Sequence, residues 1–397
     1  MERSATAGKV CHLTSAHVVE DTRILHKQCA TLAAQGYAVV LIAPSDGDRV
    51  IRGVRVKAVP RARSRLGRMT RTSFRIYRAA LAEDGDLYHF HDPELIPVGL
   101  LLRLHGKRVV YDVHEDYRTS IGQKIYLPRW LRGPLASGVA ALERLASRTF
   151  EVVLAERYYT ERFPSGTLVL NYPVVTEIAE PLARGTENRI RFVYTGGVTE
   201  DRGALYHASL VQLREDIEVH VVGRCSPELA ERMRAAAGPG RDRLHIVGEG
   251  FHVPYERIID TYREGGWTAG LAMFPSTAHY RRKELTKFFE YMAAGIPVLC
   301  SDFPVWRALV EGNGCGMCAD PADGVALRKA VEDLIGNPER SKTMGRRGRE
   351  AVSARYNWAN EAASLIRLYE RLIGVPASAA RAGGLGDEAE AFRERLA

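Results

Sequence analysis

The chain has no hydrophobic run long enough to cross a bilayer. Within its 397 residues, no uninterrupted apolar stretch approaches the ~18 residues that a membrane-spanning helix needs. The first ten residues, MERSATAGKV, lack the apolar core of a secretory signal peptide. We therefore expect a cytoplasmic protein with no membrane-spanning segment.

Cysteine is scarce, and no metal-binding pattern stands out. The six cysteines are scattered among apolar segments, so we expect them to be reduced. Cys315 and Cys318 form a lone C-x-x-C, which favours buried small side chains over zinc or redox chemistry. The Asp-Gly-Asp triplets at 46–48 and 84–86 lie beside predicted turns, and we predict no metal there. The dehydrogenase fingerprint GxGxxG is absent after the first predicted strand.

Basic residues exceed acidic ones, giving a net charge of +8, and they are concentrated in one segment. Its arginines are Arg61, Arg63, Arg65, Arg68, Arg71, Arg75 and Arg78, and its interleaved apolar residues are Leu66, Met69, Phe74 and Ile76. The pattern predicts that segment 61–78 contacts an anionic membrane surface or a phosphate-bearing acceptor; a solvated basic loop is an equally good interpretation. Because no nucleic-acid-binding module is recognisable, we expect no nucleic acid partner. Nothing in the pattern indicates an oligomeric state.

Short β-rich runs alternate with helical patterns, which is typical of parallel sheets with crossover helices. The first half predicts strands at KVCHLT, AVVLIAP, VRVKAV, DLYHFH, RVVYDV, EVVLA and TLVLN, with helices near 22–35, 70–83, 94–104 and 128–148. The second predicts strands at RIRFVYT, IEVHVVG, LHIVG, TAGLAMF, PVLC and CGMC, with helices near 203–213, 226–237, 255–264, 286–294, 323–335 and 338–354. Proline, glutamate and glycine interrupt the periodicity between 171 and 188. We therefore predict a domain over 1–172, a linker over 173–188, a second domain over 189–355, a helix over 356–372 and a mobile tail over 373–397.

The segment LTKFFEYMAAGIPVL, residues 285–299, carries the strongest functional signal. Thr286 is a good N-cap, and Gly295 suits the end of a helix that begins at about Lys287. The N–H groups of Leu285, Thr286 and Lys287 would present the positive end of the helix dipole to a phosphate. One turn later, Glu290 is placed to accept hydrogen bonds from a vicinal diol such as a ribose. For the aromatic residues alone, a buried amphipathic helix is the better interpretation, but it does not explain the carboxylate.

This segment resembles the C-terminal donor-site motif of the family 4 glycosyltransferases, and the likeness extends over most of residues 9–372. The resemblance implies an α/β GT-B fold, with two Rossmann-like domains whose parallel sheets face an interdomain cleft. It also implies that the helix at 356–372 returns to the first domain. In the family, two glutamates seven residues apart contact the donor; the second matches Glu290, but Arg282 stands at the first position. Glu284, or the backbone of Leu285 and Thr286, is available to replace the missing carboxylate.

The resemblance also assigns donor contacts to three loops of the second domain. In TGGVTEDRG, Gly196 and Gly197 follow the first strand, Gly197 stands where an arginine is usual, and Arg202 matches the phosphate-binding lysine. The fork of Arg202 can clamp phosphate oxygens, although a surface charge at a helix start is the alternative. The remaining predicted contacts to base and ribose are Gly223, Arg224, His252 and Val253. Ordinary surface loops are an alternative for these positions.

In the first domain, polar residues follow the carboxyl ends of predicted parallel strands, where ligands of such sheets bind. His91 matches the family histidine that lines the donor sugar, so we expect its ring or carbonyl to contact the sugar; His89 reads as structural. The residues assigned to acceptor contact are His17, Asp21, Arg23, His114 and Glu115. Arg23 is also placed to reach the diphosphate. The alternative is that Asp21 caps a helix and Arg23 is exposed.

We therefore predict a retaining glycosyltransferase that moves a sugar from a nucleoside diphosphate, with a UDP-sugar favoured, to a hydroxyl acceptor. Such a reaction builds a bacterial cell-surface glycan or a glycosylated metabolite. His91, Arg202 and Lys287 are the predicted catalytic residues, and no cofactor or metal is required. The alternatives are a catalytically silent nucleotide-sugar-binding scaffold and a GT-B-fold nucleotide-sugar epimerase.

Overall fold

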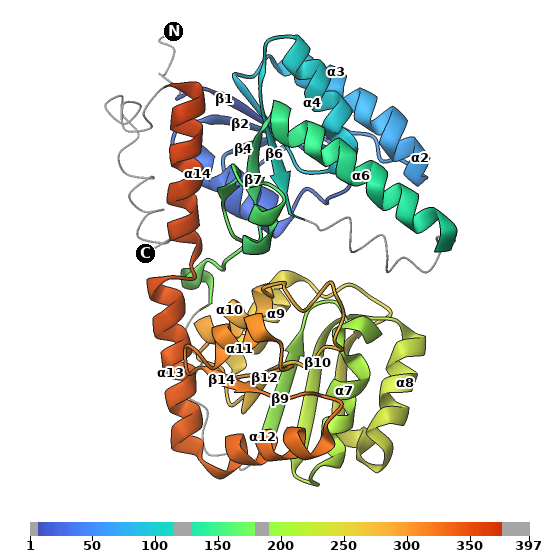
Figure 1. Cartoon of the computed structure of the whole chain (residues 1–397), viewed down its shortest axis with the longest axis vertical. Coiled ribbons are helices and arrows are strands. Elements are labelled where there is room, and N and C mark those ends of the chain that lie inside the picture. Colours follow the sequence, from blue (N-terminus) through green and yellow to red (C-terminus); the bar gives the residue numbers. More distant parts are fainter. Residues whose placement is uncertain (1–6, 115–128, 179–189, 375–397) are drawn as a thin grey trace. The chain divides into compact units, whose positions relative to one another are not determined.

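The computed structural model describes residues 7–114, 129–178 and 190–374. It divides into two compact units, with boundaries at Asn171/Tyr172 and Asn357/Trp358 (Figure 1). The predicted boundaries at 172 and 356 lie one or two residues from these. Glu115, the linker segment 179–188 and the tail beyond 374 lie outside the described residues.

The sheet of unit 1 has the strand order β3-β4-β2-β1-β5-β6-β7-β8. The strands are β1 (Lys9–Leu13), β2 (Ala38–Pro44), β3 (Arg49–Ile51), β4 (Val54–Val59), β5 (Leu87–Phe90), β6 (Arg108–Val113), β7 (Glu151–Leu154) and β8 (Thr167–Leu168). All neighbours are parallel except β3 and β4. The prediction missed β3, a three-residue hairpin strand whose Val50 is exposed, because it carries no buried apolar run.

Helices connect and cover these strands. They are η1 (Thr22–Cys29, a π-helix), α1 (Ala30–Ala34), α2 (Arg65–Gly67), η2 (Arg68–Thr72), α3 (Ser73–Glu83), η3 (Pro93–Leu95), α4 (Ile96–Leu104), α6 (Arg129–Thr149) and η4 (Arg157–Glu161). In the core between the sheet and these helices, Phe90 stacks on Tyr111, and Phe150 meets Phe90 edge-on. Gly99 lets α4 approach that stack, since a Cβ there would lie 2.8 Å from the Phe90 ring.

A C-terminal helix, α14 (Trp358–Ile373), belongs to unit 1 and packs against η1 and β8. Its first residue, Trp358, is buried and donates its indole N–H to the hydroxyl of Thr31 at 2.9 Å. The Glu361 carboxylate accepts the backbone N–H of Leu170 at 2.7 Å. The helix thereby ties the end of the chain to the sheet of unit 1.

Unit 2 is a wholly parallel sheet with the order β11-β10-β9-β12-β13-β14. Its strands are β9 (Ile190–Thr195), β10 (Ile217–Cys225), β11 (Leu244–Glu249), β12 (Ala269–Ala272), β13 (Val298–Cys300) and β14 (Gly316–Cys318). Its helices are η5 (Val175–Glu177), η6 (Glu200–Arg202), α7 (Ala204–Ser209), η7 (Leu210–Gln212), α8 (Pro227–Ala237), η8 (Gly238–Arg243), α9 (Tyr255–Glu264), α10 (Thr286–Ala293), α11 (Pro304–Val310), α12 (Gly324–Gly336) and α13 (Pro338–Ala354). The prediction missed α11. No helix in the described ranges has the length and apolarity of a bilayer span.

Candidate functional site

The N-terminus of α10 lies at the carboxyl edge of the unit 2 sheet, as a phosphate-binding helix requires. The helix begins one residue earlier than predicted, at Thr286, and Leu285 occupies the N-cap position without a side-chain cap. The prediction of Thr286 as N-cap is therefore wrong. Because no side chain caps this end, the first-turn N–H groups remain oriented for an external acceptor.

Lys287 points from the first turn of α10 to the end of β9. Its ammonium donates to the carbonyl oxygen of Thr195 at 2.9 Å and lies 3.5 Å from the centre of the Tyr194 ring. Burial, and then the nearby charge of Arg202, hold the pKa of Lys287 well below its usual range, against the attraction of Glu290. An anion placed beside this ammonium would reverse that shift, so the site gains by taking up a negative ligand.

Arg202 lies in the same part of unit 2, against Gly197. Its Nη1 is 3.5 Å from the Gly197 carbonyl oxygen, which also accepts the Tyr194 hydroxyl at 2.8 Å. A Cβ at Gly197 would lie 3.0 Å from Nη1. The glycine at the position of the family arginine thus leaves room for the guanidinium of Arg202.

The carboxyl ends of β9, β10 and β11 meet backbone to backbone at this edge because the contact residues, Gly196, Gly223 and Gly248, are glycines. A Cβ on Gly223 would lie 1.8 Å from the carbonyl oxygen of Gly196, and one on Gly248 would lie 2.4 Å from that of Gly223. The Val198 N–H donates to the carbonyl of Arg224 at 3.0 Å, while the Arg224 side chain is exposed. The predicted residues Gly196, Gly197, Gly223 and Arg224 therefore lie together.

The adjacent loop after β11 carries His252 and Val253. Val253 is buried, and its methyl group would lie 2.5 Å from a Cβ at Gly248, so its side chain packs the loop. His252 is exposed. Backbone groups, rather than the Val253 side chain, are therefore the part of this loop that can face a base.

Glu290 is half-buried and held by a tyrosine from α9. Tyr262 donates to Glu290 Oε2 at 2.8 Å, so its own oxygen accepts from the Thr195 hydroxyl at 2.7 Å. The sequence analysis missed Tyr262 and Thr195. The buried face of α9, which carries Ile259 and Tyr262, was readable, but the contact with a helix 28 residues away was not.

The loop before α10 is also fixed within unit 2. Glu284 Oε2 accepts the Tyr172 hydroxyl at 3.3 Å, and the carbonyl of Lys283 accepts the Trp306 indole N–H at 2.7 Å. Arg282, which replaces the family glutamate, is exposed. Glu284 is therefore the carboxylate that this loop holds close to the N-terminus of α10.

In unit 1, the predicted acceptor residues His17, Asp21 and His114 form one cluster at the ends of β1 and β6. His17 Nδ1 is 3.5 Å from Asp21, and its Nε2 is 3.3 Å from Asp92 and 2.9 Å from His114 Nε2. Burial opposes its charge, but the hydrogen bonds to Asp21 and Asp92 raise the pKa of His17 to about 10. His17 is therefore an imidazolium at neutral pH.

Asp21 is the helix cap that the sequence predicted, but Arg23 is neither exposed nor in the acceptor cluster. The Asp21 carboxylate accepts the N–H groups of Arg23 and Ile24, both at 2.9 Å. The Arg23 side chain, 5% exposed, makes a two-point ion pair with Asp112 at 2.9 and 2.7 Å. Both interpretations of Arg23 are wrong, because a buried carboxylate from β6 draws the guanidinium inward.

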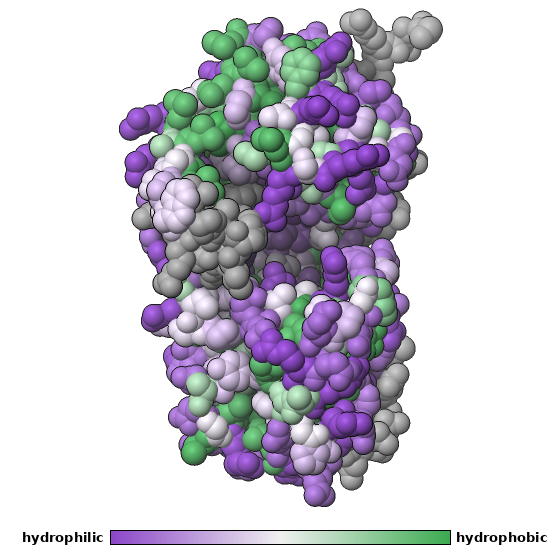
Figure 2. All heavy atoms as spheres, turned by 90° about the vertical axis from the view of Figure 1, so that its right-hand side faces the viewer, coloured by the Kyte–Doolittle hydropathy of each residue, from purple (hydrophilic) through white to green (hydrophobic). Residues whose placement is uncertain are grey.

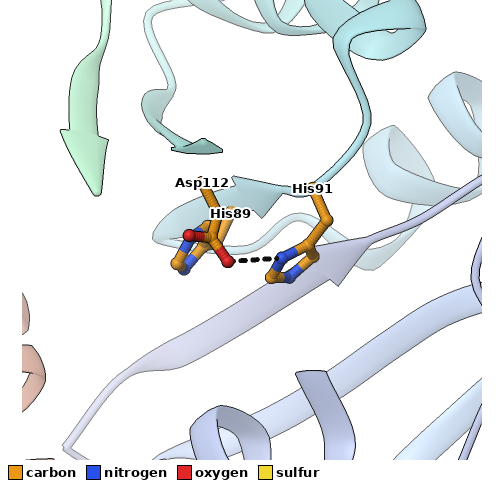
Figure 3. Close-up of side chains that lie close together, drawn as sticks. All are labelled: His89, His91 and Asp112. Atoms are coloured by element: carbon orange, nitrogen blue, oxygen red, sulfur yellow. Dashed lines mark hydrogen bonds and ion pairs between the residues drawn. The ribbon is translucent and has the colours of Figure 1, made fainter. Parts of the chain in front are cut away.

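His91 belongs to the same buried network, as Figure 3 shows. Its Nδ1 bonds Asp112 Oδ2 at 3.0 Å, and its Nε2 lies 3.0 Å from His12 Nδ1. Although burial opposes ionisation, the charge of Arg23 holds the pKa of Asp112 well below its usual range. Both ring nitrogens of His91 are therefore hydrogen-bonded within unit 1, contrary to the expectation that the ring faces a sugar. Only the backbone carbonyl of His91 remains for that contact.

The network continues to Tyr369 of α14. His12 Nε2 lies 3.2 Å from the Tyr369 hydroxyl, within hydrogen-bonding distance. The same hydroxyl lies 2.6 Å from His89 Nδ1. Burial lowers the pKa values of His12 and His89 well below their usual range, which keeps both rings neutral. His89 is thus structural, as predicted.

Within the described ranges, two groups of histidines and carboxylates have ligand atoms within 4.8 Å of one another: His89, His91 and Asp112; and Glu218, His220 and His245. In the first, Arg23 and His91 already occupy Asp112, so a cation would have to displace an ion pair. In the predicted turns, Asp48 pairs with Lys57 and Asp84 with Lys107. The first group therefore does not fit a metal.

Comparison with known proteins supports both units. A model described as Glycosyltransferase Family 4 matches residues 22–162, and one described as Glycosyl transferase-like matches residues 205–367. A phosphatidyl-myo-inositol mannosyltransferase of Mycobacterium leprae is 24% identical over 363 residues, covering 85% of this chain and 89% of the relative. The chain covers nearly the whole of that enzyme.

Solved structures share the fold at low identity. Sucrose-phosphate synthase from Thermosynechococcus elongatus superposes with a TM-score of 0.72 at 19% identity, covering 92% of this chain and 99% of that one. Anabaena HepE, solved in complex with UDP-glucose, has a TM-score of 0.69 at 12% identity, with 92% and 100% covered. Since glycosyltransferase models match both units and the fold is that of GT-B enzymes, the chain belongs to glycosyltransferase family 4.

Proposed function

We propose that the protein transfers a sugar from a nucleoside diphosphate to a hydroxyl acceptor, with retention of configuration at the sugar carbon. The observation that carries the proposal is the convergence of the α10 N-terminus, Lys287 and Arg202 at one edge of unit 2. Two cations and a helix start suit the negative charge that builds on a departing diphosphate. The HepE complex with UDP-glucose supports a nucleotide sugar as donor, and we favour a UDP-sugar.

In the proposed reaction, the bond between the sugar carbon and the diphosphate oxygen breaks while the acceptor oxygen attacks from the same face. The diphosphate leaves with the electron pair, and Arg202 and Lys287 stabilise its charge. The acceptor proton moves to the departing phosphate oxygen. Glu290, oriented by Tyr262, binds the ribose hydroxyls, and the backbone near Gly223 and Val253 contacts the base.

We assign unit 1 to the acceptor. The His17 imidazolium, held between Asp21 and Asp92, together with His114, offers charged and neutral hydrogen-bonding groups at the ends of β1 and β6. The His91 carbonyl is the group left to face positive charge on the sugar ring. The product would be part of a bacterial cell-surface glycan or a glycosylated metabolite, made without a cofactor or metal.

The test is a panel of UDP- and GDP-sugars incubated with the protein, with release of the nucleoside diphosphate as readout. Slow release from one donor, lost in Glu290→Ala, is the expected result. Interconversion of the sugar would instead indicate an epimerase, and binding without turnover a silent scaffold. If Glu290→Ala binds every nucleotide as tightly as the wild type, the assignment of this carboxylate is wrong.

We further propose that segment 61–78 docks unit 1 on an anionic membrane surface, which would place the protein in the cytoplasm at the inner face of the membrane. Leu66, Met69 and Phe74 are 73%, 55% and 60% exposed. Figure 2, viewed from the side of α2 and α3, shows apolar and hydrophilic side chains intermingled on that unit. Ile76 does not take part, because it is fully buried, and Arg68 pairs with Glu94 at 2.6 Å. Apolar residues among arginines are typical of interfacial binding.

Vesicle flotation tests this contact. We expect binding to vesicles rich in phosphatidylglycerol, little binding to phosphatidylcholine vesicles, and loss of binding in the double variant Arg71→Glu/Arg75→Glu. Arg241→Glu, which reverses an exposed charge on unit 2, is the matched control and should bind as the wild type. Equal binding to both kinds of vesicle, or no difference between the variants, would contradict the proposal.

A further inference from the structure

A second set of metal-ligand residues lies on unit 2, at the end of the sheet opposite the donor loops. Glu218 and His220 are two residues apart on β10, so both side chains project from the same face of the sheet. His245, at the start of β11, is the register partner of His220. The fold thus brings three ligand side chains onto one face of two neighbouring strands.

The distances suit a small ion. His220 Nε2 lies 3.4 Å from Glu218 Oε2, and His245 Nε2 lies 4.0 Å from the same oxygen. Ligands that surround Zn²⁺ tetrahedrally at ~2.0–2.1 Å are separated by roughly 3.3 Å. The two imidazole nitrogens lie no more than 4.8 Å apart, so closure requires a movement of up to roughly 1.5 Å. The ring of His245 packs on that of His220 with centroids 4.4 Å apart, and its side chain is 43% exposed, which leaves water access for the remaining coordination position.

Trp267 packs against His220, and Arg191 lies over the ring of the same tryptophan, paired with Glu264. Trp267 is buried, donates its indole N–H to the Thr261 carbonyl at 2.7 Å and meets the His220 ring edge-on at 5.1 Å. Arg191, the register partner of Glu218, places its guanidinium 4.1 Å over the Trp267 ring and 3.8 Å from Glu264. Glu264 also pairs with Arg257 at 3.3 Å. These contacts hold the Arg191 guanidinium against the Trp267 ring and Glu264.

We propose that Glu218, His220 and His245 form a binding site for a divalent transition-metal ion such as Zn²⁺ or Ni²⁺. Two imidazoles and one carboxylate form a donor set that suits these borderline ions better than Mg²⁺ or Ca²⁺. The ion would join β11, an edge strand, to β10 and stabilise unit 2. It would take no part in sugar transfer, because the ligands lie at the amino-terminal ends of strands whose carboxyl ends carry the donor loops.

Calorimetric titration with zinc chloride tests the site directly, after the protein has been freed of metal with a chelator and dialysed. The wild type should bind one ion per chain, and its melting temperature should rise with zinc. His245→Asn and Glu218→Gln should weaken binding at least about tenfold through loss of one ligand. His105→Asn removes an exposed histidine of unit 1 and should bind as the wild type.

Tryptophan fluorescence locates the ion independently of affinity. Bound Ni²⁺ or Co²⁺ should quench emission in the wild type but not in Trp267→Phe, because that indole contacts a proposed ligand. His245→Asn changes an exposed residue and is expected to fold, so its loss of binding would not reflect unfolding. Absence of stoichiometric zinc binding by the wild type, or wild-type affinity in His245→Asn, would overturn the proposal. Neither result depends on the transferase assay.

Discussion

The two units surround their cationic side chains with different partners. In unit 1, Arg23 is neutralised by Asp112, and the polar groups around His91 are hydrogen-bonded to one another. In unit 2, Lys287 and Arg202 donate instead to the carbonyl oxygens of Thr195 and Gly197. Carbonyl dipoles stabilise a cation without cancelling its charge, so the unit 2 edge keeps a positive potential. The ion pair of unit 1 stabilises the fold, whereas the two cationic side chains of unit 2 can still bind an anion.

The same contrast appears in the backbone. The unit 2 edge is built around glycines that let neighbouring backbones touch directly, as at Gly196 and Gly223. The unit 1 network is built from side chains on β1, β5, β6 and α14 that fill the space between them. Substitution in unit 1 should therefore change stability, whereas substitution in unit 2 should change transfer.

Asp112→Asn should have the largest effect. It leaves the buried guanidinium of Arg23 without its counter-charge, for which we expect a loss of about 3–5 kcal/mol in the free energy of unfolding. Urea denaturation followed by circular dichroism measures it. Asp216→Asn makes the same change in the exposed pair with Arg214 and should lower the free energy of unfolding far less. Equal losses would show that the unit 1 ion pair does not stabilise the fold.

Lys287→Ala and Arg202→Ala should lower the rate of sugar transfer but not the stability of the protein. Each removes a cation proposed to stabilise the departing diphosphate, and a charge-assisted hydrogen bond of about 1.5–3 kcal/mol corresponds to roughly a 12- to 160-fold fall in kcat. Stability should change little, because neither side chain neutralises a buried carboxylate through its hydrogen bonds. Arg232→Ala, which removes an exposed arginine of unit 2, is the control for activity. A fall in stability without a fall in kcat would mean that Lys287 and Arg202, like Arg23, stabilise the fold and do not act on the diphosphate.

The predicted AVVLIAP, VRVKAV and RVVYDV coincide with β2, β4 and β6. AVVLIAP and RVVYDV are recognisable because inner strands of a parallel sheet are buried on both faces and read as apolar runs. VRVKAV, next to the edge strand β3, is buried only at Val54, Val56 and Val59. The sequence also places polar residues at the correct sheet edges. It does not predict their directions: Arg23 turns inward to a carboxylate 89 residues away, and Glu290 to a tyrosine 28 residues away. Such pairings depend on how distant strands are ordered, which no local spacing records.

The pH dependence of stability tests the ion pairs of His17 in unit 1. The pKa of His17 is about 10 in the folded protein against 6.5 for an unperturbed histidine, so the folded state holds a proton that the unfolded state loses between these values. Its stabilising effect is complete below pH 6.5 and is lost as the pH rises through 10, with a slope of up to about 1.4 kcal/mol per pH unit. Urea denaturation from pH 6 to 9 should therefore show a flatter profile in His17→Asn. Parallel profiles in the two proteins would contradict the assignment, and His105→Asn should behave as the wild type.

Tyr262→Phe should have the smallest effect and shows whether unit 2 also contains a positioning network. The change removes the hydroxyl that holds Glu290 Oε2 and the Thr195 hydroxyl. A hydrogen bond of about 0.5–1.5 kcal/mol corresponds to a roughly 2- to 12-fold rise in KM for the nucleotide sugar, with kcat retained. Tyr37→Phe removes a buried hydroxyl that has no hydrogen-bond partner in the described part of unit 1, and it should leave KM unchanged. A fall in kcat with constant KM would mean that Tyr262 acts on the departing diphosphate, in which case Glu290 would not be the ribose ligand. A rise in KM alone would mean that unit 2 fixes its donor-binding carboxylate with a neutral partner and so keeps the charge available for the substrate.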